Sequence, residues 1–212
     1  MAKNVNTCTA DKQPLVIGAT KGKLVRFSYL NVHTPRASNN DDDDDEDKKL
    51  KYGVQLLIPK TNTEDIADIR AKVKAIQADG WTDNGKKVPL NFHNPLKDGD
   101  GAKDDGEPYS DECKGHFLLR TSTGSDYPPN VVGTTKSADG KFIKLGPRDI
   151  KSGDYGRVRV ALSGYIVSGK SGVTAYLASV QLVRQGEPLG SQSSAENDFK
   201  DFEDEGDASM LE

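Results

Sequence analysis

The sequence predicts a mainly β protein, a small antiparallel β-barrel with one main α-helix, and three observations lead to this. About five or six segments are rich in β-branched and aromatic residues. One segment alone carries apolar residues at helical spacing. The apolar content of the 212 residues is low, which favours one domain of ~150 residues with loose appendages over two full domains. We therefore divide the chain into a flexible arm (1–22), a domain (23–190) and a disordered acidic tail (191–212).

Two strands precede the predicted helix. Residues 23–33 read KLVRFSYLNVH, and we expect this strand to end at Pro35, because proline cannot donate to a ladder. Residues 52–58 read YGVQLLI, and their alternate positions share one face. The acidic run at 41–47 is then a loop inserted between the two strands.

The predicted helix begins near Thr61, since Thr61 and Glu64 fit a capping box. Gly80 is the expected C-terminal cap. The helix has one apolar stripe, formed by Ile66, Ile69, Val73 and Ile76.

The segment after the helix is read as long loops. Residues 81–115 contain three prolines and many turn residues, and we expect a short extended piece there at 88–93. Strand patterns return at 116–122, near 131–132 and at 141–145.

The clearest pattern is a hairpin over residues 155–184, with a turn at 168–172. Its first strand alternates aliphatic residues with polar and aromatic ones. The aliphatic face contains Val158, Val160, Leu162 and Ile166, and the opposite face contains Tyr155, Arg157, Arg159, Ser163 and Tyr165. The order of strands is compatible with an OB-fold whose helix comes early.

The net charge of −4 hides an uneven distribution of acids. The segment 196–212 carries eight acids and one base, and without it the chain has 28 bases against 25 acids, a net charge of +3. Without residues 41–47 as well, 28 bases face 18 acids, a net charge of +10. A basic body with an acidic tail favours a polyanion as ligand and a tail that competes with it. The alternative is that both acidic runs only keep the protein soluble.

Three motifs suggest enzymatic or metal chemistry, but each lacks the neighbouring residues or elements that its chemistry needs. Gly164 and Gly169-Lys170-Ser171 match a phosphate-loop pattern, but a strand, not a helix, is expected to follow. Asp98 and Asp100 lack the further ligands of a calcium loop. Cys113 and His116 have no second pair at zinc-site spacing. We expect no enzyme, no metal and no cofactor.

The remaining constellation is basic and aromatic, which is typical of surfaces that bind single-stranded nucleic acid. Positive side chains follow the phosphates there, and aromatic rings stack on bases. An ordinary wet sheet face is the alternative. The candidate residues are Phe27, Tyr29, Arg120, Tyr155, Arg157, Arg159, Tyr165, Lys170 and Tyr176.

Three segments resemble the single-stranded DNA-binding proteins of tailed phages. They are the FSYLNV strand at 27–32, KYGVQLLIPK at 51–60 and GVTAYLASVQLVRQGEPLG at 172–190, of which the last is the most specific. The resemblance covers about residues 23–189 and implies an OB-fold that coats single strands in phage replication and recombination, with no catalytic residues. The chain departs from many replication proteins of this kind by ending in Met210-Leu211-Glu212 instead of an aromatic residue.

We therefore expect a sequence-independent single-stranded DNA-binding protein that coats and protects strands during phage replication, recombination and repair. No segment is apolar enough for a membrane helix, and two cysteines fit the reducing cytoplasm of an infected host. The tail is expected to recruit phage or host replication and recombination proteins through Asp198, Phe199, Asp201, Phe202, Glu203, Asp204, Glu205, Asp207, Met210 and Leu211. Homo-oligomerisation is possible. The alternative function is a phage structural or assembly protein that uses the barrel to bind protein. A salt titration distinguishes DNA binding from protein binding, because binding to a polyanion weakens strongly with salt.

Overall fold

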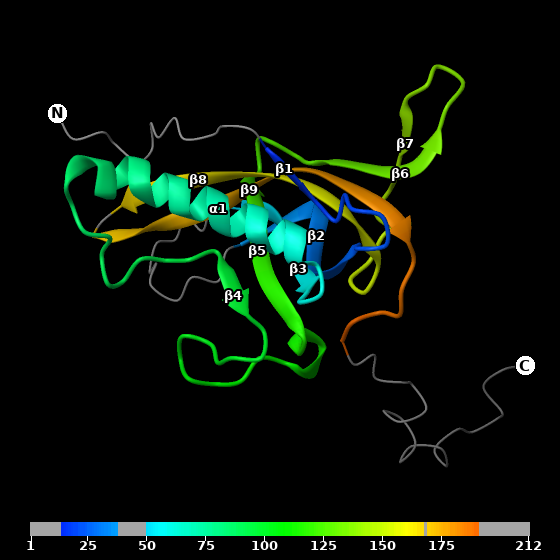
Figure 1. The fold of residues 1–212 in the computed structure, drawn as a ribbon. Helices are drawn as coiled ribbons and strands as arrows, with labels where there is room; N and C mark the ends of the chain where they lie inside the picture. Colours follow the sequence, from blue (N-terminus) through cyan, green and yellow to red (C-terminus); the bar gives the residue numbers. More distant parts are fainter. Residues whose placement is uncertain (1–13, 38–49, 168, 191–212) are drawn as a thin grey trace, which may run out of the picture.

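Five strands close into a ring in the computed structural model, which describes residues 14–37, 50–167 and 169–190 (Figure 1). Around the ring, each strand pairs with the next, and the last pairs with the first. In order, the strands are β2 (Val25–Ala37), β3 (Leu50–Pro59), β5 (His116–Gly124), β9 (Lys170–Arg184) and β8 (Tyr155–Val167). The predicted mainly β fold with one main helix is confirmed. Its description as antiparallel needs one correction, since β5 and β9 run parallel.

Short strands extend this ring at its edges. β4 (Leu96–Asp98) pairs with β5, and β6 (Asn130–Lys136) runs parallel to β9 and pairs with β7 (Phe142–Lys144). The expected extended piece at 88–93 is wrong as a strand, because His93 alone forms an isolated bridge there. The proline-rich segment pairs with β5 through β4, which begins directly after Pro95.

Part of the segment predicted as a flexible arm, residues 1–22, is a strand of the sheet. Leu15–Ile17 forms β1, which pairs with β8 in antiparallel register, and Ile17 is 1% exposed in the core. A strand of three residues is too short to show alternation in the sequence. Residues 1–13 of the predicted arm lie outside the described residues, as do the acidic run at 41–47 and the tail from 191 onward.

The core fills the ring and continues under the helix α1 (Thr63–Gly80). The predicted apolar stripe of the helix is buried against it, so the ring and the helix share one hydrophobic cluster. Two 3₁₀ turns, η2 (Thr82–Asn84) and η3 (Asp111–Cys113), lie in the long loops. The fully buried ring side chains include Val25, Phe27, Leu56, Leu119, Val158 and Val160.

The caps of the helix differ from the prediction. Asn62, not Thr61, is the N-cap, and its Oδ1 accepts a hydrogen bond from the backbone N–H of Asp65 at 3.4 Å. Asn62 is fully buried, and its Nδ2 donates to the Asp65 carboxylate and to the carbonyl of Lys23. Glu64 instead accepts from the Thr20 hydroxyl. A tertiary contact therefore selects the cap, and Gly80 belongs to the last helical turn.

Two predicted strand ends are also corrected. β2 continues through Pro35 to Ala37. Pro35 has no register partner in β3, because it lies in the irregular stretch between Asn31 and Arg36, and proline is tolerated at such irregularities. The turn predicted at 168–172 is tighter, because Val167 already pairs with Lys170. Lys170 is thus the first residue of β9, and Gly169 has a left-handed φ of +77°.

A glycine allows the ring to close where β8 meets β9. A Cβ atom on Gly156 would lie 2.0 Å from the carbonyl oxygen of Gln181 and 2.6 Å from the ring of Phe27. Because Gly156 has no side chain, the Phe27 side chain fits between the strands and is fully buried, with 0% exposure.

Candidate nucleic-acid interface

Polar and aromatic side chains cover the outer side of three neighbouring strands of the ring. The alternate residues of these strands are buried in the core, which fixes the outward direction of the others. Tyr176 on β9 is 53% exposed and lies opposite Ser122 of β5 and Ala161 of β8. Arg120, two residues before Ser122, and Arg159, two residues before Ala161, are exposed on either side. We call this surface, formed by Arg120, Ser122, Tyr176, Ala161 and Arg159, the ring face.

The ring face continues onto β3 with small and polar residues. Gln55 lies opposite Arg120, and Gly53 lies opposite Ser122. The row from Gly53 across Ser122 to Tyr176 therefore has no long side chain beside the tyrosine ring. A flat base can approach Tyr176 there, with a guanidinium group on each flank.

Tyr165 and Lys170 lie at the far end of the β8–β9 hairpin. Tyr165 is four residues from Ala161 on the same side of β8, about 13 Å along the strand. Burial raises the pKa of Tyr165, while the positive charges of Lys170 and Lys97 act in the opposite direction. Lys97 comes from β4, and its ammonium forms an ion pair with Asp104 at 3.2 Å.

Arg157 is held toward the neighbouring strands. Its guanidinium donates a hydrogen bond to Oε1 of Gln181 at 3.1 Å, and Nε2 of Gln181 donates to the carbonyl oxygen of Gly133 at 3.2 Å. The predicted set of Arg120, Arg157, Arg159, Tyr165 and Tyr176 therefore lies on one outer surface of β5, β9 and β8.

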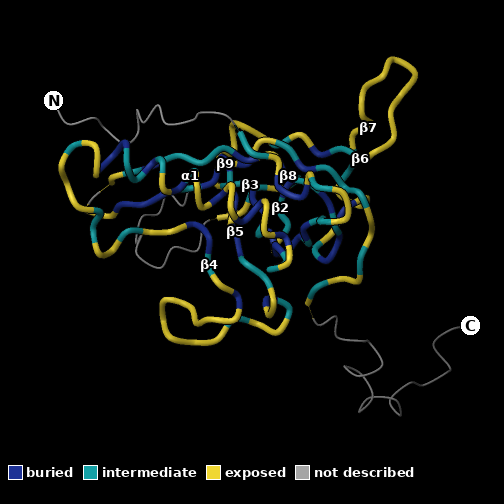
Figure 2. The backbone as a smooth tube through the Cα atoms, viewed as in Figure 1, coloured by how far each residue is buried: buried dark blue, intermediate teal, exposed yellow. Residues whose placement is uncertain are grey.

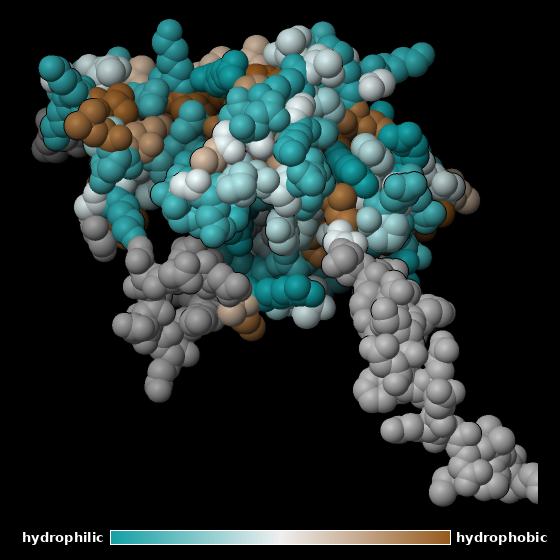
Figure 3. Space-filling view, turned by 90° about the horizontal axis from the view of Figure 1, so that it is seen from below, coloured by the Kyte–Doolittle hydropathy of each residue, from teal (hydrophilic) through white to brown (hydrophobic). Residues whose placement is uncertain are grey.

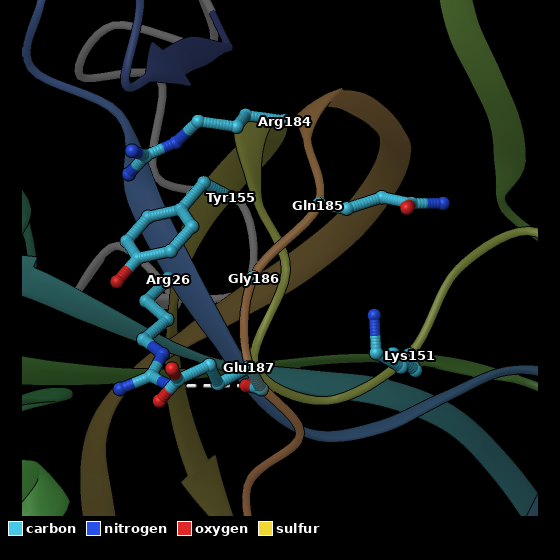
Figure 4. A pocket seen from close by; sticks show the side chains of 7 residues that line it. All are labelled: Arg26, Lys151, Tyr155, Arg184, Gln185, Gly186 and Glu187. Carbon is cyan, nitrogen blue, oxygen red and sulfur yellow. Dashed lines mark hydrogen bonds between the residues drawn. The ribbon is translucent and has the colours of Figure 1, made fainter.

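Tyr155 lies at the opposite end of β8, in an open pocket of about 490 Å³ that also contains Lys151 and Glu187 (Figure 4). The guanidinium carbon of Arg184 is 4.2 Å from the centre of the Tyr155 ring, and that of Arg26 is 5.6 Å away. Arg26 also donates to the carbonyl oxygen of Glu187 at 3.0 Å. The aromatic ring of Tyr155 therefore already packs against two guanidinium groups, which leaves it less open to stacking on a base. Its role is to orient the exposed Arg184.

Two predicted contacts on β2 are placed differently. Phe27 is fully buried in the core, so it cannot stack on a base, and the prediction for this residue is wrong. Tyr29 is 69% exposed but has a φ of +47°, in the left-handed region, within the register irregularity between Ser28 and Asn31. The irregularity breaks the alternation that had placed both residues on one face. The next residue, Leu30, donates its N–H to the Ser152 hydroxyl, and the assignment of Tyr29 to the DNA path stays a prediction.

A covering segment limits the ring face toward the lower ends of β3 and β5. Leu57 and Leu118 point outward but are buried by Cys113, Tyr109 and Leu189. Figure 2 shows the exposed loop that follows β4 on this side of the molecule. The open part of the outer surface is therefore the half that contains Arg120 and Tyr176.

Lys60 bridges Asp98 and Asp100 in the turn of this loop, with its ammonium 2.6 Å and 2.7 Å from the two carboxylates, and offsets one of their two negative charges. Hydrogen bonds from Lys60 lower the pKa of both aspartates, and the same bonds raise the pKa of Lys60. In the described part of the chain, no group of three or more His, Cys, Asp or Glu side chains is arranged to hold a metal ion.

The phosphate-loop pattern lies between two strands, as the sequence indicated. Gly164 belongs to β8, and Lys170 and Ser171 belong to β9. The hairpin has no helix N-terminus at which to hold a nucleotide phosphate.

The outer surface seen from below is mostly hydrophilic, and apolar side chains appear on it as separate spots (Figure 3). Across the described residues, no helix has both the length and the apolar composition needed to span a membrane.

Gln55, Lys97 and Gln181 were not predicted from the sequence. Gln55 lies in a segment that was predicted to be a strand, and Lys97 lies in one that was predicted to be a loop. The register of β3 with β5 is needed to show that Gln55 lies opposite Arg120. The tail residues predicted to bind partners lie outside the described residues.

Comparisons with known proteins agree with this architecture. A family model described as the single-stranded DNA-binding protein of Enterobacter phage Enc34 matches residues 16–209. The p50 protein of Acyrthosiphon pisum secondary endosymbiont phage 1 is 30% identical over 161 residues, which cover 72% of this chain and 79% of that protein.

Two solved structures share the fold at lower identity. The single-stranded DNA-binding protein from bacteriophage Enc34, in complex with single-stranded DNA, has a TM-score of 0.58 at 21% identity, over 79% of this chain and 87% of its own. The single-stranded DNA-binding protein gp2.5 of bacteriophage T7 has a TM-score of 0.53 at 15% identity, over 90% and 94%.

Proposed function

We propose that this chain, which belongs to the Enc34 family of phage single-stranded DNA-binding proteins, binds single-stranded DNA without regard to base sequence. One observation carries the proposal: Tyr176 is exposed at the centre of the ring face, between Arg120 and Arg159. An aromatic ring stacks on any base, and flanking guanidinium groups bind phosphates of any sequence. The family membership confirms the resemblance found in the sequence.

We further propose that the ring is an OB-fold. In that fold, the second and third strands and the loop between the fourth and fifth strands bind oligonucleotides. The corresponding elements here are β3, β5 and the β8–β9 connection next to Lys170. Arg120 and Ser122 of the ring face lie on β5, and Lys170 adjoins the β8–β9 connection, which supports the assignment of these residues to the DNA path. Tyr176 on β9 and Tyr165 on β8 lie on the strands next to these elements. Arg157 and Arg159 extend the path along β8.

Fluorescence anisotropy with a labelled dT oligonucleotide tests the ring face. Tyr176→Ala should weaken binding by about 1–3 kcal/mol, because a stacked base is lost, whereas Tyr176→Phe keeps the ring and should bind normally. Arg120→Gln should reduce the salt dependence by about 0.7 in the log–log slope, since one phosphate contact is lost on a single strand.

Lys74→Gln is the matched control, because it removes one charge from an exposed position on α1. If Tyr176→Ala and Arg120→Gln bind like the wild-type protein and remain folded, the ring face is not the DNA site. Binding that hardly changes with salt would instead favour a protein ligand.

The acidic tail is proposed to compete with DNA and to recruit partner proteins. Its support is the charge distribution: residues 196–212 have a net charge of −7, and the rest of the chain has +3. Truncation after Ala195 should tighten DNA binding at low salt and less so at high salt, because screening weakens the attraction between tail and ring. Equal dissociation constants at low salt would refute the competition.

The proposed setting is phage DNA replication, recombination and repair in the cytoplasm of the infected host. The tail's apolar residues Phe199, Phe202, Met210 and Leu211 are the proposed anchors for phage or host replication proteins. Pull-down of those proteins from infected cells by the full chain, and its loss on truncation after Ala195, tests this role. Recovery of the same proteins by the truncated chain would refute it.

A further inference from the structure

A two-stranded arm, residues 133–144, projects from the ring at the end of β6 (Figure 1). β6 pairs with β9 only over residues 130–132, and β7 pairs with β6 alone. All three residues of β7 are exposed, and the arm stands clear of the core (Figure 2). A hairpin of two strands is only marginally stable in water by itself, and this one is anchored through the pairing of β6 with β9 at its base.

The two-stranded arm carries one aromatic side chain, Phe142, and an excess of positive charge. Phe142 is 44% exposed, and Nζ of Lys136 lies 5.1 Å from the centre of its ring. The arm contains three lysines and one acid, Asp139, which forms an ion pair with Lys141 at 3.1 Å. Lys136 and Lys144 therefore leave a net positive charge around an exposed aromatic ring.

The strand register places the aromatic side chain of Phe142 on the same side of the sheet as the ring face. Directly paired residues of neighbouring strands point to one face of a sheet. Lys144 lies opposite Val132, and Val132 lies opposite Gln181, which accepts the hydrogen bond from Arg157. Phe142 is two residues from Lys144 and shares its side, whereas Ile143 points to the other side.

We propose that the arm is a second contact site for single-stranded DNA, in which Phe142 stacks on a base and Lys136 and Lys144 bind the flanking phosphates. This inference rests on the proposed function, since the arm extends the same path beyond Arg157. The positive charge favours a polyanion over a second copy of the chain, whose arm would carry the same charge. The site extends the footprint of one protein and makes affinity depend on oligonucleotide length.

Anisotropy titrations with two labelled oligonucleotides test the arm, one of about 6 and one of about 16 thymidines, within the range that one OB-fold covers. Phe142→Ala should weaken binding of the longer strand about 5- to 150-fold, the loss expected for one stacked base, and leave the shorter strand within twofold. Ile143→Ala is the matched control, because Ile143 is equally exposed, at 46%, on the opposite side. It should bind both strands normally.

The outcomes separate this inference from the proposed function. If the wild-type protein binds neither strand at low salt, the proposed function fails and the arm site fails with it. If the wild-type protein binds both strands, and Phe142→Ala binds the longer one as tightly, the arm alone is refuted. Sedimentation velocity without DNA tests whether the arm binds a second copy of the chain instead. If the wild-type protein is a dimer and Phe142→Ala is a monomer, the arm is a dimer contact and the DNA site is refuted.

Discussion

Replacing Gly156 with alanine tests how the ring closes. The new Cβ atom would lie 2.0 Å from the carbonyl oxygen of Gln181, while ordinary contacts begin at 3.4 Å. The two strands must therefore separate by about 1.4 Å, which breaks the one or two ladder hydrogen bonds beside Gly156, each worth about 1 kcal/mol. Phe27, only 2.6 Å from the same atom, must also shift, and overpacking of this kind costs about 1–3 kcal/mol.

The free energy of unfolding should fall by about 2–5 kcal/mol, a large part of the 5–15 kcal/mol typical of a domain. In a protein of this size, that corresponds to a decrease in Tm of about 10 °C. Urea denaturation followed by circular dichroism measures it. Gly124→Ala is the matched control, because it also lies in a strand of the ring, and its Cβ meets nothing within 4 Å. A Gly156→Ala protein within 1 kcal/mol of Gly124→Ala would refute the packing argument.

Three further predictions concern the site and its supports. Tyr29→Gly should be more stable than Tyr29→Ala by about 1 kcal/mol in urea denaturation, because alanine keeps the strained left-handed φ; equal stabilities would show that no strain is stored there. Arg157→Gln should lower the salt slope of DNA binding by about 0.7, with Lys74→Gln as the control, and an unchanged slope would remove Arg157 from the path. Hydrogen bonds to Lys60 lower the pKa of Asp98 and Asp100, so their contribution to stability is present above the ordinary carboxyl pKa of about 4 and is lost as the pH falls through the lower folded values. Lys60→Met should flatten this acid limb of the stability profile, and an unchanged limb would show that the ion pairs contribute nothing.

The sequence was sufficient for elements with strong periodicity. The β8–β9 hairpin alternates over more than ten residues, and the helix stripe has four apolar residues, so both were predicted close to their observed bounds. The outward side chains of Arg157, Arg159 and Tyr165 follow from the same alternation. The parallel pairing of β5 with β9 could not be read, because strand alternation is the same in parallel and antiparallel pairs.

Features that depend on tertiary contacts were missed. The alternation of β2 placed Phe27 and Tyr29 on one face, but an irregular register and a left-handed residue turn Tyr29 outward while Phe27 enters the core. Asn62 became the helix cap because its side chain also reaches the carbonyl of Lys23. Neither a bulge nor a buried amide leaves a periodic signal in the sequence.

The arrangement of acids explains how a chain of net negative charge presents a basic surface. Fifteen of its 33 acids lie in 41–47 and 196–212, outside the described residues. Within the ring, Asp154 is fully buried, and its carboxylate accepts hydrogen bonds from Lys151 and from the backbone N–H of Gly186. Among the described residues, neither Arg120 nor Arg159 forms an ion pair, so their charges stay available on the ring face. Affinity for a polyanion should therefore follow this local charge, and its salt dependence should survive removal of the tail even though the net charge changes sign.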